Sequence, residues 1–137
     1  MKIYNEYITL QTAEKREFVD LTPQIKAAVE KCGFRDGIVL VSSLHSNASV
    51  IVSDNEPGFL EDLRDWLEEA APREKEYKHG QKFESSAAIH LQGLLLHHQA
   101  VIGLTEGRLD LGPWQVVLFA ELDGQRPKRI LVKLLGE

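Results

Sequence analysis

Residues 100–135 read AVIGLTEGRLDLGPWQVVLFAELDGQRPKRILVKLL, and this stretch decides the fold class. It contains four apolar, strand-like segments, which glycines and an Asp-Gly pair separate. The spacers are too short for the helical crossovers that join parallel strands. The pattern therefore predicts neighbouring strands of a largely antiparallel sheet, at 100–104, 108–111, 114–121 and 128–135.

The rest of the chain adds helices and further strands. Thr22, as a capping hydroxyl, and Pro23, as a first helical residue, start a helix that Gly33 ends. The sum is a single α+β domain over residues 1–137, a largely antiparallel sheet packed with about three helices. The other predicted strands are 2–11 and 16–21, expected as a hairpin, and 37–42 and 49–53; the predicted helices are 22–32, 59–70 and 86–96.

Composition excludes several classes of partner. The 137 residues include 21 acidic and 16 basic side chains, which give a formal net charge of −5. A protein that binds phosphate backbones needs a basic excess, so we expect no nucleic acid partner. No apolar run approaches the roughly 18 residues that cross a bilayer, so we expect no membrane partner. Cys32 has no second cysteine to pair with, and the first residues form no targeting signal, which favours the cytoplasm.

Three of the five histidines come from separate elements that a compact fold can bring together. His45 lies in a polar loop after an apolar strand, His79 in a charged loop and His90 on a helix. Imidazole is both a metal ligand and a proton carrier near neutral pH. No H-E-x-x-H spacing links any two of them, so ordinary surface or partly buried histidines remain the alternative. His97 and His98 end the same helix as His90, where capping is the simpler explanation.

Carboxylates and hydroxyls near these histidines suit the same kind of site. Glu56 and Glu84 are hard oxygen donors that would complete a mixed site for Mg²⁺, Mn²⁺ or Zn²⁺. Ser46 and Asn47, next to His45, suit contacts to an anionic oxygen. The alternative for all four residues is turn chemistry and solvation.

Residues 106–115, EGRLDLGPWQ, form the most unusual stretch of the chain. Two glycines bracket an alternating segment, which predicts a tight hairpin where glycine admits positive φ. Trp114 is expected to anchor in the core because it precedes the apolar run that begins at Val116. Gln115 then points to the opposite face as a polar contact.

The ordered set of motifs resembles the YjbQ family over nearly the whole chain. The Leu-Gly-x-Trp-Gln element at 111–115 is the most specific of them, and the histidine motifs come next. The matching motifs are SLHSNAS (43–49), YKH (77–79), IHL (89–91), GRLDLGPWQ (107–115) and ELDGQR (121–126).

The resemblance implies a small α+β fold, a homotrimer and a pocket built from three histidines. In that pocket His45, His79 and His90 are expected to hold a divalent metal and to take part in catalysis. The family is associated with secondary thiamine-phosphate synthase activity. The implied substrate contacts are Ser46, Asn47, Gln92, Trp114 and Gln115, and the implied outer partners of the metal ligands are Glu56, Glu84 and Glu121.

We therefore expect a metal-dependent enzyme that acts on a small phosphorylated molecule. In thiamine-phosphate synthase chemistry, a divalent ion would neutralise the departing pyrophosphate. Two alternatives remain open at this stage. One is a trimer that binds a metal or an anionic metabolite without catalysis, and the other is a metal-dependent phosphoester hydrolase.

Overall fold

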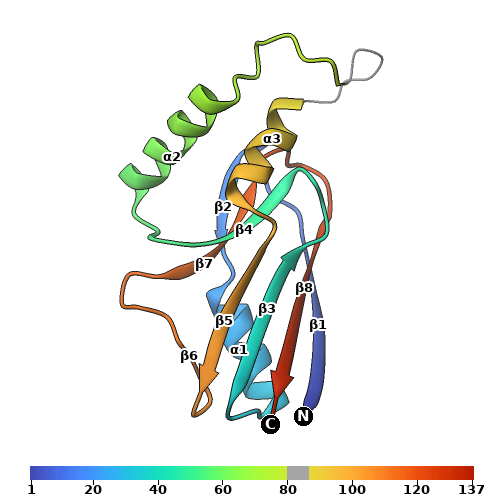
Figure 1. Ribbon diagram of the computed structural model, residues 1–137, viewed down its shortest axis with the longest axis vertical. Coiled ribbons are helices and arrows are strands. Elements are labelled where there is room, and N and C mark those ends of the chain that lie inside the picture. The colour runs from blue at the N-terminus through green and yellow to red at the C-terminus, as the bar shows by residue number, and fades with distance from the viewer. Residues whose placement is uncertain (80–86) are drawn as a thin grey trace.

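The computed structural model describes residues 1–79 and 87–137, where three helices and eight strands form a single α+β fold (Figure 1). The fold class expected from the sequence is confirmed. The strands are β1 (Lys2–Leu10), β2 (Glu17–Asp20), β3 (Gly37–Ser43), β4 (Ala48–Ser53), β5 (Gln99–Thr105), β6 (Arg108–Leu109), β7 (Val116–Glu121) and β8 (Lys128–Gly136). The helices are α1 (Thr22–Cys32), α2 (Pro57–Ala70) and α3 (Ala87–Leu96).

All the strands pair in an antiparallel sense, in two sheets. One sheet has the order β1-β8-β3-β5-β6 and the other the order β2-β7-β4. Both termini lie at the same end of the molecule (Figure 1), where the Met1 ammonium donates to Glu137 Oε1 at 2.8 Å. The hairpin predicted at 106–115 is present, since β5 and β6 join through Glu106 and Gly107, both with positive φ.

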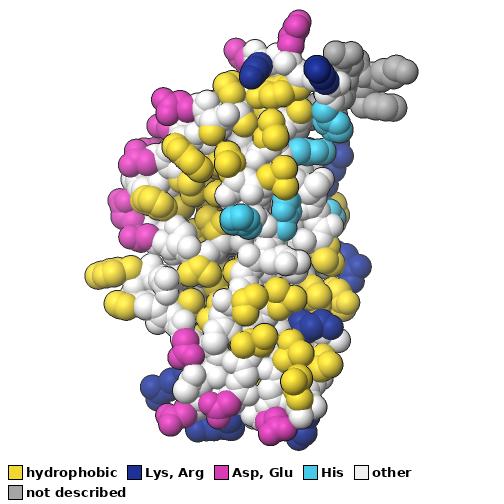
Figure 2. All heavy atoms as spheres, in the orientation of Figure 1, with side chains coloured by type: hydrophobic (Ala, Val, Ile, Leu, Met, Phe, Trp, Pro, Cys, Tyr) yellow, Lys and Arg dark blue, Asp and Glu magenta, His cyan; other side chains and the backbone are white. Residues whose placement is uncertain are grey.

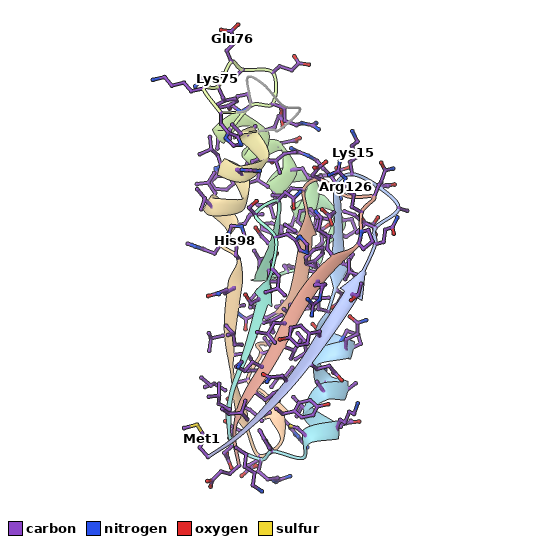
Figure 3. The ribbon with its side chains drawn as sticks, turned by 90° about the vertical axis from the view of Figure 1, so that its right-hand side faces the viewer. Met1, Lys15, Lys75, Glu76, His98 and Arg126 are labelled. Carbon is purple, nitrogen blue, oxygen red and sulfur yellow. The ribbon has the colours of Figure 1, made fainter. Side chains whose placement is uncertain are left out.

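The main core lies between the two sheets and α1, which packs against one face of the five-stranded sheet (Figure 3). Gly33 ends α1 as expected, with φ +73° and its N–H bonded to the Val29 carbonyl. The predicted cap at Thr22 is wrong, because Leu21 occupies the N-cap position without a side-chain bond. Thr22 Oγ1 instead accepts the Val117 N–H at 2.9 Å, which ties the start of α1 to β7.

The hairpin predicted from segments 2–11 and 16–21 is wrong. β1 pairs with β8 in one sheet, whereas β2 pairs with β7 in the other. The segment between them crosses from sheet to sheet and packs on the turn before β8. Gly124 donates its N–H to the Lys15 carbonyl, and a Cβ on Gly124 would lie 2.2 Å from the Glu14 carbonyl oxygen. The crossing therefore needs glycine at this contact.

A second, smaller cluster attaches α2 and α3 to the sheets. It consists of Leu67, Ile89 and Leu122, from α2, α3 and the residue after β7. The loop between β3 and β4, residues 44–47, lies against α3, because a Cβ on Gly93 would be 3.0 Å from the Ser46 carbonyl oxygen. These contacts bring the histidine-bearing segments to the same half of the molecule.

Candidate functional site

Histidine side chains gather over the half of the molecule that contains α3, while acidic side chains line the edge over α2 (Figure 2). Within this group His79 and His90 form a close pair, with ring centroids 5.0 Å apart and ring planes inclined by 45°. They share an open, largely apolar hollow, whose other lining residues are Tyr77, Lys78, Ala87 and Leu91. The structure therefore brings two of the three predicted ligands together.

The ring nitrogens of His79 and His90 have no hydrogen-bond partner among residues 1–79 and 87–137. Nitrogens that share a tetrahedral Zn²⁺ lie about 2.1 Å from it, which brings the ring centres to roughly 5 Å from each other. The centroid distance of the pair is therefore compatible with a shared metal ion, and no described residue bonds the ring nitrogens. However, no group of three or more metal-ligating side chains is found in the part of the chain that the structure describes.

His45 lies in the loop between β3 and β4, where its ring is bonded to the start of β8. Its Nε2 accepts the backbone N–H of Arg129 at 2.9 Å, and the Leu44 N–H donates to the Arg129 carbonyl at 3.2 Å. The Ser43 hydroxyl donates to the His45 carbonyl at 3.1 Å and accepts the His45 N–H at 3.2 Å. Burial lowers the pKa of His45 below its ordinary value, and the Lys128 ammonium lowers the pKa further.

Asn47 belongs to a buried polar cluster that the sequence did not reveal. Lys128, 2% exposed, donates to Asn47 Oδ1 at 2.9 Å, to Glu121 Oε1 at 2.6 Å and to the Asp123 carbonyl at 3.1 Å. Asp123 also donates its N–H to Glu121 Oε1. All three ammonium protons of Lys128 are therefore used, and Glu121 braces the 44–47 loop through Lys128 rather than facing an open pocket.

Lys128 had a detectable signal in the sequence. It shares strand parity with Ile130, Val132 and Leu134, which all point into the core. A lysine at the first inward position of an apolar strand must find acidic or carbonyl partners, because an unpaired buried ammonium is very costly. Its acidic partner, Glu121, was expected to support the metal-binding histidines from outside the coordination sphere. In the structure it bonds Lys128 instead.

Gln92, expected to contact phosphate, is completely buried and fully bonded. Its Oε1 accepts from Arg16 Nη2 at 2.9 Å, and its Nε2 donates to the carbonyls of Ala71 at 3.0 Å and Leu67 at 3.3 Å. The side chain thus binds the carbonyls at the end of α2. The Arg73 N–H and the charges of Arg73 and Arg16 lower the pKa of Glu68 beside it.

Trp114 and Gln115 lie apart from the histidines. Trp114 is 78% exposed, so its predicted place in the core is wrong: β7 begins only at Val116, and the turn before it leaves the indole outside. Gln115 Oε1 accepts the Gly112 N–H at 2.8 Å. Gln115 lines a different hollow, against the start of α1, and none of the five histidines lines it.

The other predicted partners also have local roles or fall outside the description. The Glu56 carboxylate caps α2 by accepting the N–H groups of Gly58 at 3.0 Å and Phe59 at 2.7 Å. Glu84 lies outside the described residues. Ser46 is exposed, and its carbonyl lies 3.4 Å from His98 Nε2.

His97 and His98 follow α3, as the sequence suggested. His97 has φ +68°, a left-handed conformation that ends the helix, and its N–H bonds the Leu94 carbonyl at 3.4 Å. His98 lies where α3 meets β5 (Figure 3). These backbone positions agree with the simpler, structural explanation of both residues.

The site and fold define a small α+β protein with a solvent-open histidine pair. No helix within residues 1–79 and 87–137 is long and apolar enough to span a membrane. Residues 6–137 match the family described as UPF0047 protein YjbQ-like, and the chain belongs to this family.

Relatives and solved structures agree with this assignment. The chain is 40% identical to a UPF0047 protein of Archaeoglobus fulgidus over 93% of this chain and 98% of the relative. It is 34% identical to a UPF0047 protein of Methanothermobacter thermautotrophicus over 100% and 95% of the two chains. A crystal structure of a YbjQ-like protein of unknown function from Sulfolobus solfataricus superposes with a TM-score of 0.94 at 35% identity, covering 99% of each chain.

Proposed function

We propose that this protein is a metal-dependent enzyme that acts on a small phosphorylated substrate, with His79 and His90 as metal ligands. The observation that carries the proposal is the 5.0 Å pair of imidazoles in one open hollow. His79 is exposed and His90 half-buried, and no described residue bonds their ring nitrogens, so the nitrogens are open to a ligand. Free imidazoles facing a hollow are what a metal site requires before the ion binds.

Two imidazoles fit a catalytic site better than a structural one. Structural zinc sites are closed by four protein ligands, whereas catalytic sites have three protein ligands and keep the fourth position open for substrate or water. A divalent ion bound there would neutralise negative charge that develops on phosphoryl oxygens. Lys78, in the same hollow, adds a cation that would attract and orient a phosphorylated molecule.

The metal proposal is tested by elemental analysis of purified protein after incubation with Zn²⁺ or Mn²⁺. We expect wild-type protein to retain the metal through gel filtration, and His79→Ala and His90→Ala to lose it. His97→Ala is the matched control, since it removes an exposed histidine at the end of the same helix. Full retention of metal by both variants of the pair would refute the proposal.

For the reaction itself we propose secondary thiamine-phosphate synthase activity, which rests on the YjbQ resemblance. The chain would join a thiazole phosphate to a pyrimidine pyrophosphate and release pyrophosphate. We expect product when both precursors and Mg²⁺ are mixed with wild-type protein, and none with His79→Ala or His90→Ala. Product at the same level in all three proteins would contradict this reaction.

A non-catalytic binder is the second candidate, and the bonding of Gln92 favours it. Because the Gln92 amide is used inside the fold, it offers no donor to a phosphate beside His90. A pure binder would retain metal and phosphate yet form no product. We further propose a homotrimer in the cytoplasm; light scattering after gel filtration tests the trimer, and fractionation of the source cells tests the location.

A further inference from the structure

The three histidines predicted as equivalent ligands differ in what their ring nitrogens do. A neutral imidazole has one N–H and one lone pair, on different nitrogens. In His79 and His90 both nitrogens lack a partner among the described residues, whereas the Nε2 of His45 accepts the Arg129 N–H at 2.9 Å. A backbone N–H can only donate, so the lone pair of His45 must be on Nε2.

The other nitrogen of His45 must then carry the proton. The Nδ1 atom has no partner in the described part of the chain, and it is not among the buried polar atoms that lack one. It is therefore open to solvent as a hydrogen-bond donor. Metal ligation through Nε2 would break the bond to Arg129, and ligation through Nδ1 would move the proton to Nε2, against the Arg129 N–H.

Several hydrogen bonds fix the loop that carries His45, so the ring is held in position to accept the Arg129 N–H. Lys128 Nζ holds Asn47 from the residue before Arg129, and the Leu122 N–H donates to the Asn47 carbonyl at 3.3 Å. The Leu44 N–H bonds Arg129 as well. Both ends of the loop are thus bonded to the same end of β8 and the adjacent turn.

We propose that His45 is not a metal ligand but a fixed hydrogen-bond donor, whose Nδ1–H binds a phosphoryl oxygen of the substrate. The fixed tautomer follows from the structure alone, whereas the phosphoryl contact rests on the proposed function. Ser46, the next residue in the chain, is exposed, so its hydroxyl is also open to an anion. A donor held in place before binding loses little freedom when the anion arrives.

Nitrogen NMR of histidine-labelled protein near pH 8 tests the tautomer without any ligand. We expect His45 to show protonated Nδ1 and unprotonated Nε2, whereas exposed His97 should show the mixture of a free imidazole, in which Nε2–H dominates. A dominant Nε2–H tautomer at His45 would overturn the inference.

Titration of the same sample with Zn²⁺ and, separately, with inorganic phosphate tests the two roles. Zn²⁺ should shift the ring nitrogens of His79 and His90 and leave those of His45 unchanged, while phosphate should shift His45 Nδ1–H. A zinc-induced shift at His45 Nε2 would refute the donor role. If Zn²⁺ shifts no histidine, the metal proposal fails, while the tautomer of His45 stays independently measurable.

Two substitutions, His45→Asn and His45→Gln, test the roles of the two ring nitrogens separately. The asparagine amide reaches the Nδ1 position, and the glutamine amide reaches the Nε2 position. We expect His45→Asn to keep phosphate affinity within about threefold, and His45→Gln and His45→Ala to lose about tenfold, as for a lost charge-assisted hydrogen bond. All three should retain Zn²⁺ like the wild type. Loss of Zn²⁺ in His45→Ala, or equal phosphate affinity in all four proteins, would overturn the proposal.

Discussion

The 44–47 loop and the His79–His90 hollow both adjoin α3 but use their polar groups in opposite ways. In the loop, His45 and Asn47 bond to β8, and Lys128 below them has all its protons occupied. In the hollow, two imidazole rings lie 5.0 Å apart, and no described residue bonds their nitrogens. The three histidines that the sequence assigned to one site therefore belong to two regions. The 44–47 loop is fixed by its own hydrogen bonds, whereas the His79–His90 hollow is open to a ligand.

Breaking the buried ion pair below the loop should have the largest effect on stability. Lys128→Met leaves the Glu121 carboxylate, 1% exposed, without its counter-ion, and its Oε2 has no hydrogen-bond partner among the described residues. Removing one member of a buried pair costs about 3–5 kcal/mol of unfolding free energy, measured by urea denaturation. Lys133→Met, on the same strand but half-buried, should cost less than about 1 kcal/mol. Equal losses would show that the pair contributes nothing special.

The double variant Glu121→Gln/Lys128→Met sharpens this prediction. If the penalty of the single variant comes from an uncompensated charge, neutralising Glu121 should restore part of the lost stability. A double variant less stable than Lys128→Met would show that the hydrogen bonds, rather than the charge, dominate.

Gln92 should have the next largest effect, because it joins three segments. Gln92→Ala removes three hydrogen bonds and buried volume, which together cost roughly 2–4 kcal/mol. Leu94→Ala, on the exposed face of the same helix, should change stability by less than about 0.5 kcal/mol. Because the lost bonds hold the end of α2, hydrogen exchange should increase at Ala70 and Ala71 in Gln92→Ala. Unchanged exchange there would contradict the role of Gln92 at the end of α2.

Local sequence pattern predicted most elements but not the partners of β1 and β2. Alternation predicts a strand, yet the choice of neighbour depends on long-range register, so the expected hairpin is replaced by pairing with β8 and β7. The sequence pattern also could not predict which face of α3 is buried. The helix is apolar on all sides, and Leu91, Leu94 and Leu95 are exposed.

The candidate site divides in the same way between local and long-range information. The pairing of His79 with His90 agrees with the expected convergence of two elements. The bond from Arg129 to His45 could not be predicted, because a backbone N–H has no sequence signature. An apolar run does not by itself predict burial, as Trp114 shows. It lies in a turn two residues before β7 and is 78% exposed.

The loop and the hollow should also differ when single histidines are removed. His45→Ala loses the bond to Arg129 and should cost about 1 kcal/mol of unfolding free energy. His79→Ala removes an exposed ring with no bond in the described part of the chain, so its cost should stay within about 0.5 kcal/mol. Urea denaturation in the absence of metal measures both losses of unfolding free energy. A larger loss for His79→Ala than for His45→Ala would contradict the view that only the loop histidine is bonded within the fold.

The smallest effect concerns pH. Burial and Lys128 lower the pKa of His45 below 6.5 in the folded protein. Between that lower pKa and 6.5, His45 binds more protons in the unfolded chain than in the folded one, so its contribution to stability decreases as pH falls through this window and is constant above it. Glutamine does not titrate in this range. The difference in unfolding free energy between wild type and His45→Gln should therefore be constant above pH 6.5 and decrease below it. Glu68, whose pKa is lowered from 4.5, acts only at lower pH. Parallel stability curves for the two proteins between pH 5 and 7 would contradict the lowered pKa.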